Sequence, residues 1–522
     1  MRGGWQLRRV LPRTRLFSTI GEGGTDRRWP GWEVVVGLEV HAQIKSRSKL
    51  FSDSLTSDPS ESHNTCVSPY DAAFPGTLPK LNSKCVDLTL RTAIALNSQI
   101  QRRSAFDRKH YFYADIPAGY QITQHYAPVA MGGHLDLETG RLVRIKQIQI
   151  EQDTGKSTFD ARRRVSMIDL NRAGTGLMEI VSEPDMRSPE EAGVYLRTLQ
   201  SILRSVGSSD GNMEQGSLRC DVNVSVNRPG EPSGTRCEVK NLNSVKFMQV
   251  AIACEVFRQI ELLEKGEAVQ QETRGFDEAG ARTFSLRSKE DAPDYRYMPD
   301  PNLPLLLLDQ SYVDRIRSTM PELPGETRAR LLKQGLTVRD VDVLTSVDAG
   351  REVGFDGQLG EGAVVYFDAV AIGRNPKIVV NWITQDLLGQ LAARNLTFKE
   401  NPISTQQLGD LVDIVQNGSI TGTSAKTLLR HMLDQRSAAL PSELAREMSL
   451  FALPADGDSG SSELEQWCRD AMAAVPAETA AAKKGHSGVI NRLVGRVMKM
   501  SRGRANALKA KEVLQSMLRG PD

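Results

Sequence analysis

Apolar and polar residues alternate along several segments in the N-terminal half of the chain. In residues 37–44 the even positions are apolar, whereas the odd positions include Glu39, His41 and Gln43. Because residues i and i+2 of a β-strand lie on the same face, this alternation predicts a strand with one buried and one polar face. Residues 218–226 and 236–240 alternate in the same way on either side of a turn-rich loop at 227–234. Together they predict a β-hairpin.

Apolar residues recur at helical spacing in three other segments. This spacing predicts helices at 86–98, 189–206 and 244–265, each with Pro or Gly nearby. Strand and helix patterns together indicate an antiparallel sheet with helices packed on it between residues 30 and 308. Beyond Leu308 the helical pattern dominates. The sequence therefore predicts an α+β protein with a sheet domain at 30–308, a helical connector at 309–375 and a helical tail domain at 376–522.

The first residues differ in composition from the rest of the chain. Residues 1–20 contain no acidic residue and several arginines, namely Arg2, Arg8, Arg9, Arg13 and Arg15. This composition is typical of a mitochondrial presequence, which we place at residues 1–25. A disordered basic tail would have the same composition. No run of about 18 apolar residues is present, so no membrane span is predicted.

Acidic residues recur on the polar faces of the predicted strands. These groups take the parity opposite to that of their apolar neighbours: Glu39 with His41, Glu151 with Asp153, Glu179, and Asp221 with Asn223. Neighbouring carboxylates repel one another unless a cation or a proton lies between them. The pattern therefore predicts a divalent-metal site suited to phosphate chemistry, with a solvated strand face as the alternative. His41 is an unusual magnesium ligand, so it would bind an ion such as manganese or orient another ligand.

Two shorter motifs bear on nucleotide binding. Residues 154–157 (TGKS) resemble the end of a P-loop, but the glycine that the motif needs five positions before Gly155 is replaced by Ile150. We therefore exclude a P-loop and expect any nucleotide to be held by side chains and metal on a sheet. Arg172 and Arg296 lie in predicted turns, where a guanidinium group suits phosphate oxygens or a structural ion pair equally well.

Basic residues accumulate near the C-terminus. Between residues 483 and 519 there are ten Lys or Arg residues and one acidic residue, Glu512. No aromatic residue lies among them, so the segment predicts contact with the phosphate backbone of a folded nucleic acid rather than base stacking. A solvated helix face is the alternative. The candidate contacts are Arg492, Arg496, Lys499, Arg502 and Arg504.

Taken together, these and further segments resemble the aspartyl/glutamyl-tRNA amidotransferase B family in a mitochondrial version. The matching segments keep one order along the chain: 37–46 (GLEVHAQIKS), 74–82 (FPGTLPKLN), 106–124 (FDRKHYFYADIPAGYQITQ), 151–157 (EQDTGKS), 169–184 (DLNRAGTGLMEIVSEP), 213–224 (MEQGSLRCDVNV), 238–244 (EVKNLNS), 294–301 (DYRYMPDP) and 493–506 (LVGRVMKMSRGRAN). The similarity extends from about residue 32 to residue 519. So many ordered matches are more specific than any single motif.

The resemblance implies a glutamine-synthetase-like, antiparallel-sheet catalytic cradle, followed by a helical connector and a helical tail that holds tRNA. It implies a ligase that uses ATP and Mg²⁺ to phosphorylate the side-chain carboxylate of glutamate misacylated onto tRNA(Gln). Ammonia from a glutaminase partner within the same amidotransferase then replaces phosphate, and a small third subunit completes a heterotrimer in the mitochondrial matrix.

Site residues follow from the same resemblance. The implied metal ligands are Glu39, His41, Glu151 and Glu179. Lys109 matches a lysine near the mouth of the ammonia channel and joins these four as a candidate catalytic residue. The candidate cofactor-binding residues are Asn171, Arg172, Lys240 and Arg296.

The chain departs from the bacterial pattern at several positions. Where that pattern has Glu-Glu-Asp, this chain has Glu151, Gln152 and Asp153, so either Glu151 or Asp153 would replace the missing acid. A lysine on the channel side is replaced by Ala118, and Cys66 alone remains of a paired-cysteine metal site found in some members. Two other functions stay open, a non-catalytic tRNA-binding scaffold of the same complex and a ligase acting on free glutamate.

Overall fold

The computed structural model describes residues 26–58, 60–288, 294–452, 458–483, 487–501 and 503–519. They form two compact units. The first contains the described residues up to Pro324 together with Val353–Leu359, and the second contains Gly325–Glu352 and the described residues from Gly360 onward. All the described strands lie before residue 308, and helices prevail after it, so the predicted α+β class is confirmed. The predicted presequence lies outside the described residues.

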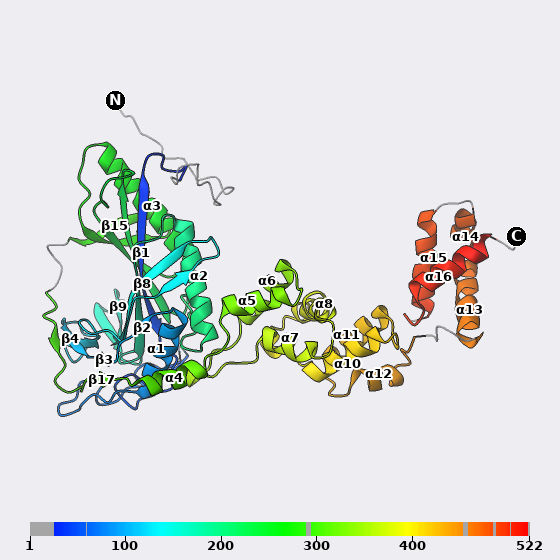
Figure 1. Cartoon of the computed structure of the whole chain (residues 1–522), viewed down its shortest axis with the longest axis horizontal. Coiled ribbons are helices and arrows are strands. Elements are labelled where there is room, and N and C mark those ends of the chain that lie inside the picture. The colour runs from blue at the N-terminus through cyan, green and yellow to red at the C-terminus, as the bar shows by residue number, and fades with distance from the viewer. Residues whose placement is uncertain are drawn as a thin grey trace. The chain divides into compact units, whose positions relative to one another are not determined.

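A ten-stranded sheet forms the centre of the first unit (Figure 1). Its strands are β1 Glu33–Gln43, β2 Gln99–Ile100, β6 Ala130–Met131, β7 His134–Asp136, β8 Leu142–Gln152, β11 Gly176–Ser182, β12 Leu218–Asn227, β13 Cys237–Leu242, β14 Glu272–Asp277 and β15 Arg282–Ser288. Their order is β15-β14-β13-β12-β1-β11-β8-β6-β2, and β7 pairs with β8 outside this path. The predicted hairpin is confirmed as β12 and β13.

Three helices cover the apolar face of this sheet, namely α1 Ser83–Ala95, α2 Pro189–Ser205 and α3 Val245–Glu264. Even-numbered residues of β1 such as Val36 and Val40 are fully buried in the same core as these helices. Residues at odd positions of β1 consequently face the other side of the sheet. One face of each central strand thus stabilises the fold, and the other is left for polar groups.

The predicted helices are confirmed, with small differences at their ends. Each follows a side chain that accepts a backbone N–H at the first turn: Asn82 for α1, Ser188 for α2 and Ser244 for α3. α1 begins at Ser83, before the predicted residue 86, because Asn82 provides its cap.

The sheet differs from the predicted antiparallel arrangement at one place. β13 and β14 pair in parallel, whereas β1 is antiparallel to both of its neighbours. Parallel neighbours need a crossover connection, and α3 provides it between β13 and β14. Alternation of apolar residues carries no information on strand direction, so the sequence pattern could not reveal this pair.

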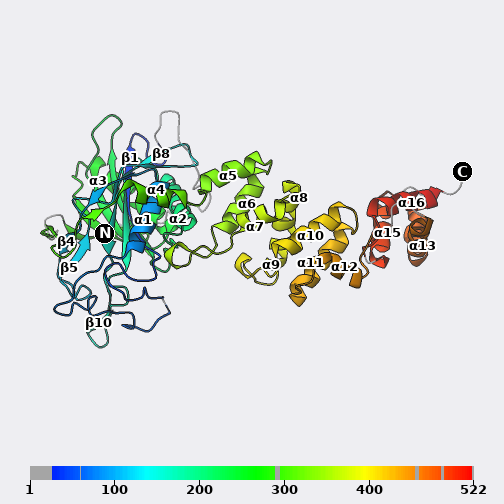
Figure 2. The ribbon, with the colours of Figure 1, turned by 60° about the horizontal axis from the view of Figure 1, so that its bottom comes forward.

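Three smaller sheets complete the first unit. β16 Met298–Pro299, β4 Asp107–His110 and β5 Tyr120–Thr123 form one; β9 Lys156–Asp160 and β10 Val165–Asp169 form a hairpin; β3 Arg103–Ser104 pairs with β17 Leu306–Leu307. Figure 2 shows β4 and β5 side by side. A P-loop would begin a helix at Lys156, where β9 begins instead, so excluding that motif was correct.

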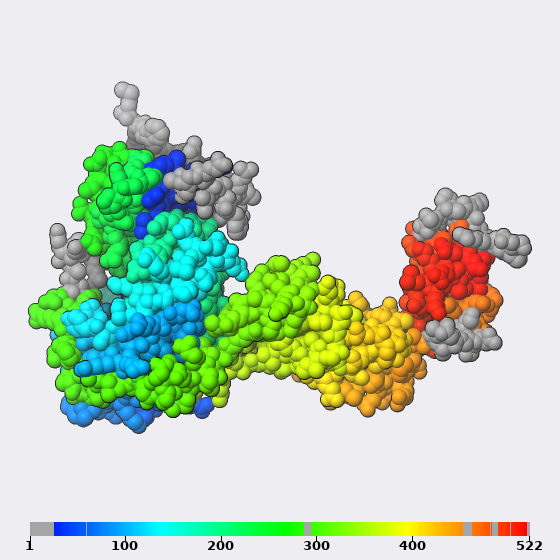
Figure 3. Space-filling model, in the orientation of Figure 1, coloured from blue at the N-terminus to red at the C-terminus, as the bar shows by residue number. Residues whose placement is uncertain are grey.

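Helix α4 Gln310–Ser318 of the first unit packs beside α1, although the two are far apart in the sequence. The space-filling view shows green atoms of this segment lying against blue ones (Figure 3). The Tyr312 hydroxyl donates a hydrogen bond to the carboxylate of Asp87 on α1.

The second unit is helical in its described residues. Its α-helices are α5 Pro324–Lys333, α6 Val338–Asp348, α7 Ala363–Ala371, α8 Pro376–Asn381, α9 Leu388–Ala392, α10 Thr405–Gln416, α11 Gly422–Gln435, α12 Pro441–Glu447, α13 Asp458–Ala474, α14 Pro476–Lys483, α15 Ser487–Met500 and α16 Ala507–Arg519. One hydrophobic core joins residues between Leu331 and Leu450, and another joins residues between Leu464 and Leu514. The predicted connector at 309–375 and tail at 376–522 stay predictions.

None of the helices in the described part of the chain combines the length and the apolar character that crossing a bilayer requires.

Candidate active site

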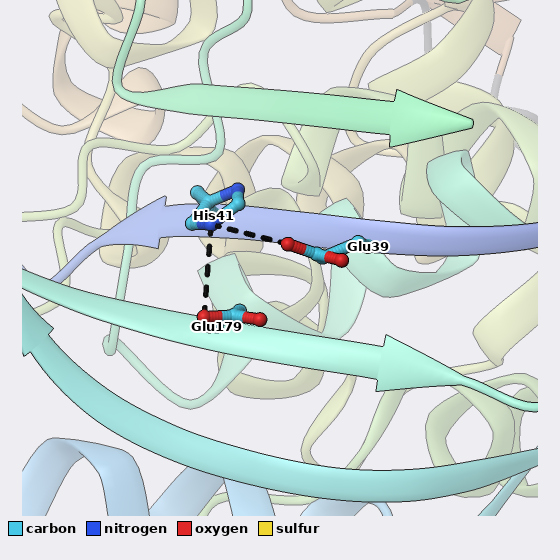
Figure 4. A group of neighbouring side chains, drawn as sticks. All are labelled: Glu39, His41 and Glu179. Carbon is cyan, nitrogen blue, oxygen red and sulfur yellow. Dashed lines mark ion pairs between the residues drawn. The ribbon is translucent and has the colours of Figure 1, made fainter. Parts of the chain in front are cut away.

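Three neighbouring strands bring the predicted metal ligands together. β1 carries Glu39 and His41, β11 carries Glu179, and β8 carries Glu151. The Nε2 atom of His41 lies 3.8 Å from a carboxylate oxygen of Glu39, 3.8 Å from one of Glu179 and 3.5 Å from one of Glu151. We call these four residues the carboxylate cluster. Figure 4 shows Glu39 and Glu179 beside the imidazole of His41, with one ligand atom from each of these three residues within 4.8 Å of the others.

The cluster concentrates negative charge on a largely desolvated face. Burial, together with the neighbouring charges of Glu151 and Glu39, raises the pKa of Glu179 well above its usual range. Burial opposes the positive charge of Lys109, which comes from β4, but the nearby acidic groups, Glu151 foremost and Glu179 among them, together outweigh burial and raise the pKa of Lys109. A cation near these carboxylates is therefore favoured.

Asp153 lies close in sequence but takes no part in the carboxylate cluster. Its Oδ1 atom is 2.8 Å from Nη2 of Arg219, and its Oδ2 atom is 3.5 Å from Nε of Arg172. Although burial opposes its charge, these two arginines lower the pKa of Asp153. Of the two acids that flank Gln152, Glu151 is thus the one beside His41, and Asp153 neutralises arginines.

The candidate cofactor-binding residues differ in the number of hydrogen bonds and ion pairs that they make within the chain. Arg172 donates to the carbonyl oxygens of Thr154 and Gly155, and the Asn171 amide donates to the carbonyl oxygen of Ser62 and accepts from the backbone N–H of Cys66. Both side chains therefore brace neighbouring loops in this structure.

Lys240 and Arg296 are in different surroundings. Lys240 lies on the same sheet as the carboxylate cluster, with its Nζ 2.5 Å from Asp221 and 3.0 Å from Glu238. Arg296 is exposed over 82% of its side chain, and its Nε lies 3.5 Å from a carboxylate oxygen of Asp294 in a loose ion pair. Of the four candidates, Arg296 keeps the most freedom to meet a ligand.

Comparison with known proteins shows to which protein family the chain belongs. The family model described as the GatB/GatE catalytic domain matches residues 34–314, which include the whole carboxylate cluster, and the model described as the GatB domain matches residues 365–518. The chain belongs to the GatB family.

Relatives across fungi and bacteria agree with this assignment. The B subunit of the mitochondrial glutamyl-tRNA(Gln) amidotransferase from Laccaria bicolor is 57% identical over 95% of this chain and 94% of its own length. The protein of the same name from Cryptococcus neoformans is 47% identical over 97% of this chain and 96% of its own length. The B subunit of the aspartyl/glutamyl-tRNA(Asn/Gln) amidotransferase from Bartonella tribocorum is 42% identical over 93% of this chain and 95% of its own length.

The structure adds Gln149 to the site of this GatB-family protein. Gln149 lies on β8, and its Nε2 atom donates to Glu179 at 2.5 Å and to Thr123 Oγ1 of β5 at 3.3 Å. The amide thus orients Glu179 and ties the small sheet to the large one. Gln149 was not among the residues predicted from the sequence, although its parity, shared with Glu151, was a signal that it lies on the same face.

The predicted tRNA contacts of the tail fall into two groups. Arg492, Arg496 and Lys499 are exposed on α15, where their spacing places them on one face, away from buried Leu493 and Val497. Arg492 is 72% exposed although it lies 3.4 Å from Glu478. Arg504 instead donates to the carbonyl oxygen of Phe451 and lies 3.7 Å from Glu463, so it also supports the fold. Arg502 lies outside the described residues.

Proposed function

We propose that this chain is the B subunit of a mitochondrial glutamyl-tRNA(Gln) amidotransferase and that the carboxylate cluster is its active site. The complex is an ATP-dependent ligase that converts Glu-tRNA(Gln) to Gln-tRNA(Gln) with glutamine as the amido donor. The observation that carries this proposal is the convergence of Glu39, His41, Glu151 and Glu179 from three strands inside the matched catalytic domain.

The reaction needs two steps because a carboxylate is a poor electrophile. An oxygen of the glutamate side chain attacks the γ-phosphorus of ATP, the bond from that phosphorus to the β-γ bridging oxygen breaks, and an acyl phosphate and ADP result. Ammonia then attacks the acyl carbon, inorganic phosphate leaves with the C–O bond electrons, and the ammonium formed loses a proton. The product is the side-chain amide of glutamine, still esterified to tRNA.

The residues of the cluster fit a divalent ion. Carboxylate oxygens prefer hard cations such as Mg²⁺, and the crowding that raises the pKa of Glu179 is relieved by a cation as well as by a proton. Glu39, His41, Glu151 and Glu179 would hold the ion, which when bound offsets the charge of the phosphate groups. His41 makes Mn²⁺ an alternative occupant, since imidazole nitrogen suits it better.

The chain's own cations have separate roles in this proposal. Lys109 lies against the cluster with a raised pKa, so it stays protonated and attracts an anionic acyl group. Arg296 is an exposed candidate for the ATP phosphates. Lys240, paired with Asp221 and Glu238 on the same sheet, is a further candidate, and Asn171 and Arg172 brace the neighbouring loops.

A complex of several different chains supplies the remaining parts. We propose a heterotrimer in which a glutaminase partner generates ammonia and a small third subunit completes the assembly in the mitochondrial matrix. Ammonia must arrive unprotonated, which favours a shielded route over bulk water. The face of α15 with Arg492, Arg496 and Lys499 is proposed to hold tRNA.

Reconstitution of the complex tests the function directly. Purified with its partner proteins, the chain should convert Glu-tRNA(Gln) to Gln-tRNA(Gln) with ATP and glutamine, and ATP hydrolysis should depend on Glu-tRNA(Gln). ATP hydrolysis at the same rate with and without Glu-tRNA(Gln) would favour a scaffold role. Tight tRNA binding without any ATP hydrolysis would favour it too. Efficient turnover of free glutamate would indicate a small-molecule ligase.

Replacing Gln149 by Met should slow amidation while leaving tRNA affinity unchanged. The variant removes a hydrogen bond to a charged carboxylate, for which about 1.5–3 kcal/mol is typical, so the rate should fall about 10- to 100-fold. Single-turnover assays of Gln-tRNA formation measure the rate. Gln101→Met is the matched control, because the amide of Gln101 bonds only to the carbonyl oxygen of Gln99 among the described residues. An unchanged rate in Gln149→Met would exclude the orienting role.

Removing the exposed cations of α15 should weaken tRNA binding through phosphate contacts. In Arg492→Ala/Arg496→Ala/Lys499→Ala, the slope of log K against log salt should decrease by about 3, about one for each lost contact. Titrations with tRNA(Gln) at several salt concentrations measure this slope. The double variant Lys399→Ala/Arg446→Ala removes two exposed cations of the second unit that lie outside α15, and it should change the slope less. Equal slopes in the wild type and triple variant would contradict the assignment.

A further inference from the structure

A continuous series of aromatic rings lies in the segments that directly follow β4 and β5 and directly precede β16. Successive ring centroids are 5.7 Å apart from Tyr113 to Tyr111, 5.9 Å from Tyr111 to Tyr295 and 6.0 Å from Tyr295 to Tyr297. His125 then stacks on Tyr297 at 3.8 Å with an interplanar angle of 7°, and Tyr126 follows at 4.7 Å. We call these six residues the aromatic ladder.

The aromatic ladder adjoins the carboxylate cluster. Lys109, which pairs electrostatically with Glu151, has its Nζ 4.8 Å from the ring centroid of Tyr295 and 5.9 Å from that of Tyr111. The Tyr111 hydroxyl donates to Gln121, whose amide in turn donates to the carbonyl oxygen of Gln152 on β8. The Gln149–Thr123 hydrogen bond is a second link between the two sheets. A molecule lying along the ladder would therefore reach the site of phosphorylation.

The ladder is more than the packing of a buried core. Its end members are open to solvent, with Tyr126 exposed over 66% and Tyr113 over 63% of their surface. Most of its pairs meet edge to face, an arrangement that leaves one ring of each pair with an uncovered face. Aromatic faces arranged in series are what single-stranded nucleic acid uses for base stacking.

Charge near the ladder complements a nucleic acid. Arg296 stands between Tyr295 and Tyr297 in the chain with 82% of its side chain exposed. Arg108 on β4 is not available in the same way, because its Nε lies 2.7 Å from the buried carboxylate of Asp300. The guanidinium of Arg296 suits a phosphate oxygen of a phosphodiester group as well as one of ATP, so the choice of a nucleic acid rests on the series of rings.

We propose that the aromatic ladder holds the unpaired 3′ nucleotides of the tRNA by base stacking and so positions the esterified glutamate at the carboxylate cluster. This inference rests on the proposed function. The occupant is a polynucleotide end rather than the adenine of ATP, because solvent-open rings lie at both ends of the ladder and a single base would use only one. The glutamate is attached to the last nucleotide, so the bases before it must pass beside the cluster.

Binding measurements on the assembled complex test the ladder. The wild type should bind intact tRNA(Gln) at least about fivefold more tightly than the same tRNA trimmed of its unpaired 3′ nucleotides. In Tyr126→Ala and in Tyr113→Ala the ratio of the two affinities should fall towards one. In Tyr126→Trp, which keeps an aromatic ring at this position, the ratio should stay near the wild-type value. Phe159→Ala is the matched control, because Phe159 is also 66% exposed but belongs to the β9–β10 hairpin and not to the ladder. The KM for ATP should stay the same in every variant.

Each alternative result is distinguishable. A raised KM for ATP in Tyr126→Ala, with an unchanged trimming ratio, would mean that the ladder holds the adenine of ATP and would overturn the proposal. Unchanged values for both would mean that the rings only support the fold, and would overturn it too. Because the trimming ratio is a binding measurement, it remains informative if the complex fails to amidate Glu-tRNA, a failure that would refute the proposed function instead.

Discussion

Replacing Glu179 by Gln is expected to reduce Gln-tRNA formation at least about 100-fold, the loss typical when one group that stabilises transition-state charge is removed. Glu179 faces His41 in register across β1 and β11 and receives the Gln149 hydrogen bond. A neutral amide keeps the size of the side chain but lowers the negative charge that attracts a divalent ion. The measurement is single-turnover amidation by the assembled complex at saturating ATP, with tRNA affinity determined in parallel and expected to be unchanged.

Glu183→Gln is the matched control for this variant. Glu183 follows the end of the same strand and lies outside the carboxylate cluster, so its replacement should leave the rate within a few-fold of the wild type. Full activity of Glu179→Gln would remove the argument for a metal at this position. A simultaneous loss of tRNA binding would point instead to damage of the fold.

Replacing Lys49 by Met is expected to destabilise the first unit by about 3–5 kcal/mol, the usual cost of leaving a buried charge without its partner. Lys49 and Asp71 lie 3.2 Å apart and are almost completely buried, with side-chain exposures of 0% and 1%. The Lys49 ammonium also donates to the carbonyl oxygens of Cys66 and Leu170. It therefore holds the loop that leads to Asn171 and Arg172. Denaturant unfolding of the chain measures the change in free energy.

An exposed pair of the same type provides the comparison. Lys80 and Asp53 lie 3.3 Å apart, but their side chains are 74% and 85% exposed, so Lys80→Met should cost less than about 1 kcal/mol. Adding Asp71→Asn to Lys49→Met removes the unpaired charge and should recover part of the loss. Similar losses for Lys49→Met and Lys80→Met would show that burial is not what makes the inner pair important.

Several features of the site could be predicted because they depend on local periodicity. The alternation of apolar and polar residues was sufficient to place Glu39, His41, Glu151 and Glu179 on the polar faces of strands, and the resemblance of the ordered motifs then implied these four as metal ligands. The structure brings these four residues together. The parity of Asp153, equal to that of Glu151, could not reveal that its carboxylate turns to Arg219, because that contact joins β12 to the end of β8.

Other features depend on contacts between segments that are distant in the sequence. The aromatic ladder joins residues near 111, 125 and 295, and no local pattern relates them. The same holds for Lys49, whose partners lie at Cys66, Asp71 and Leu170. Burial and charge pairing of such residues are set by the packing of loops on the sheet.

The sequence by itself determined the α+β class, which face of each central strand is polar, and the membership of the GatB family. Each of these follows from local periodicity or from motifs in a set order along the chain. Only the tertiary structure decided which acid stands beside His41, which arginines are already neutralised, and which strands run parallel. The physical reason is that strand pairing and ion pairing are through-space interactions. Their strength depends on register and desolvation, and neither is encoded in the spacing of residues along the chain.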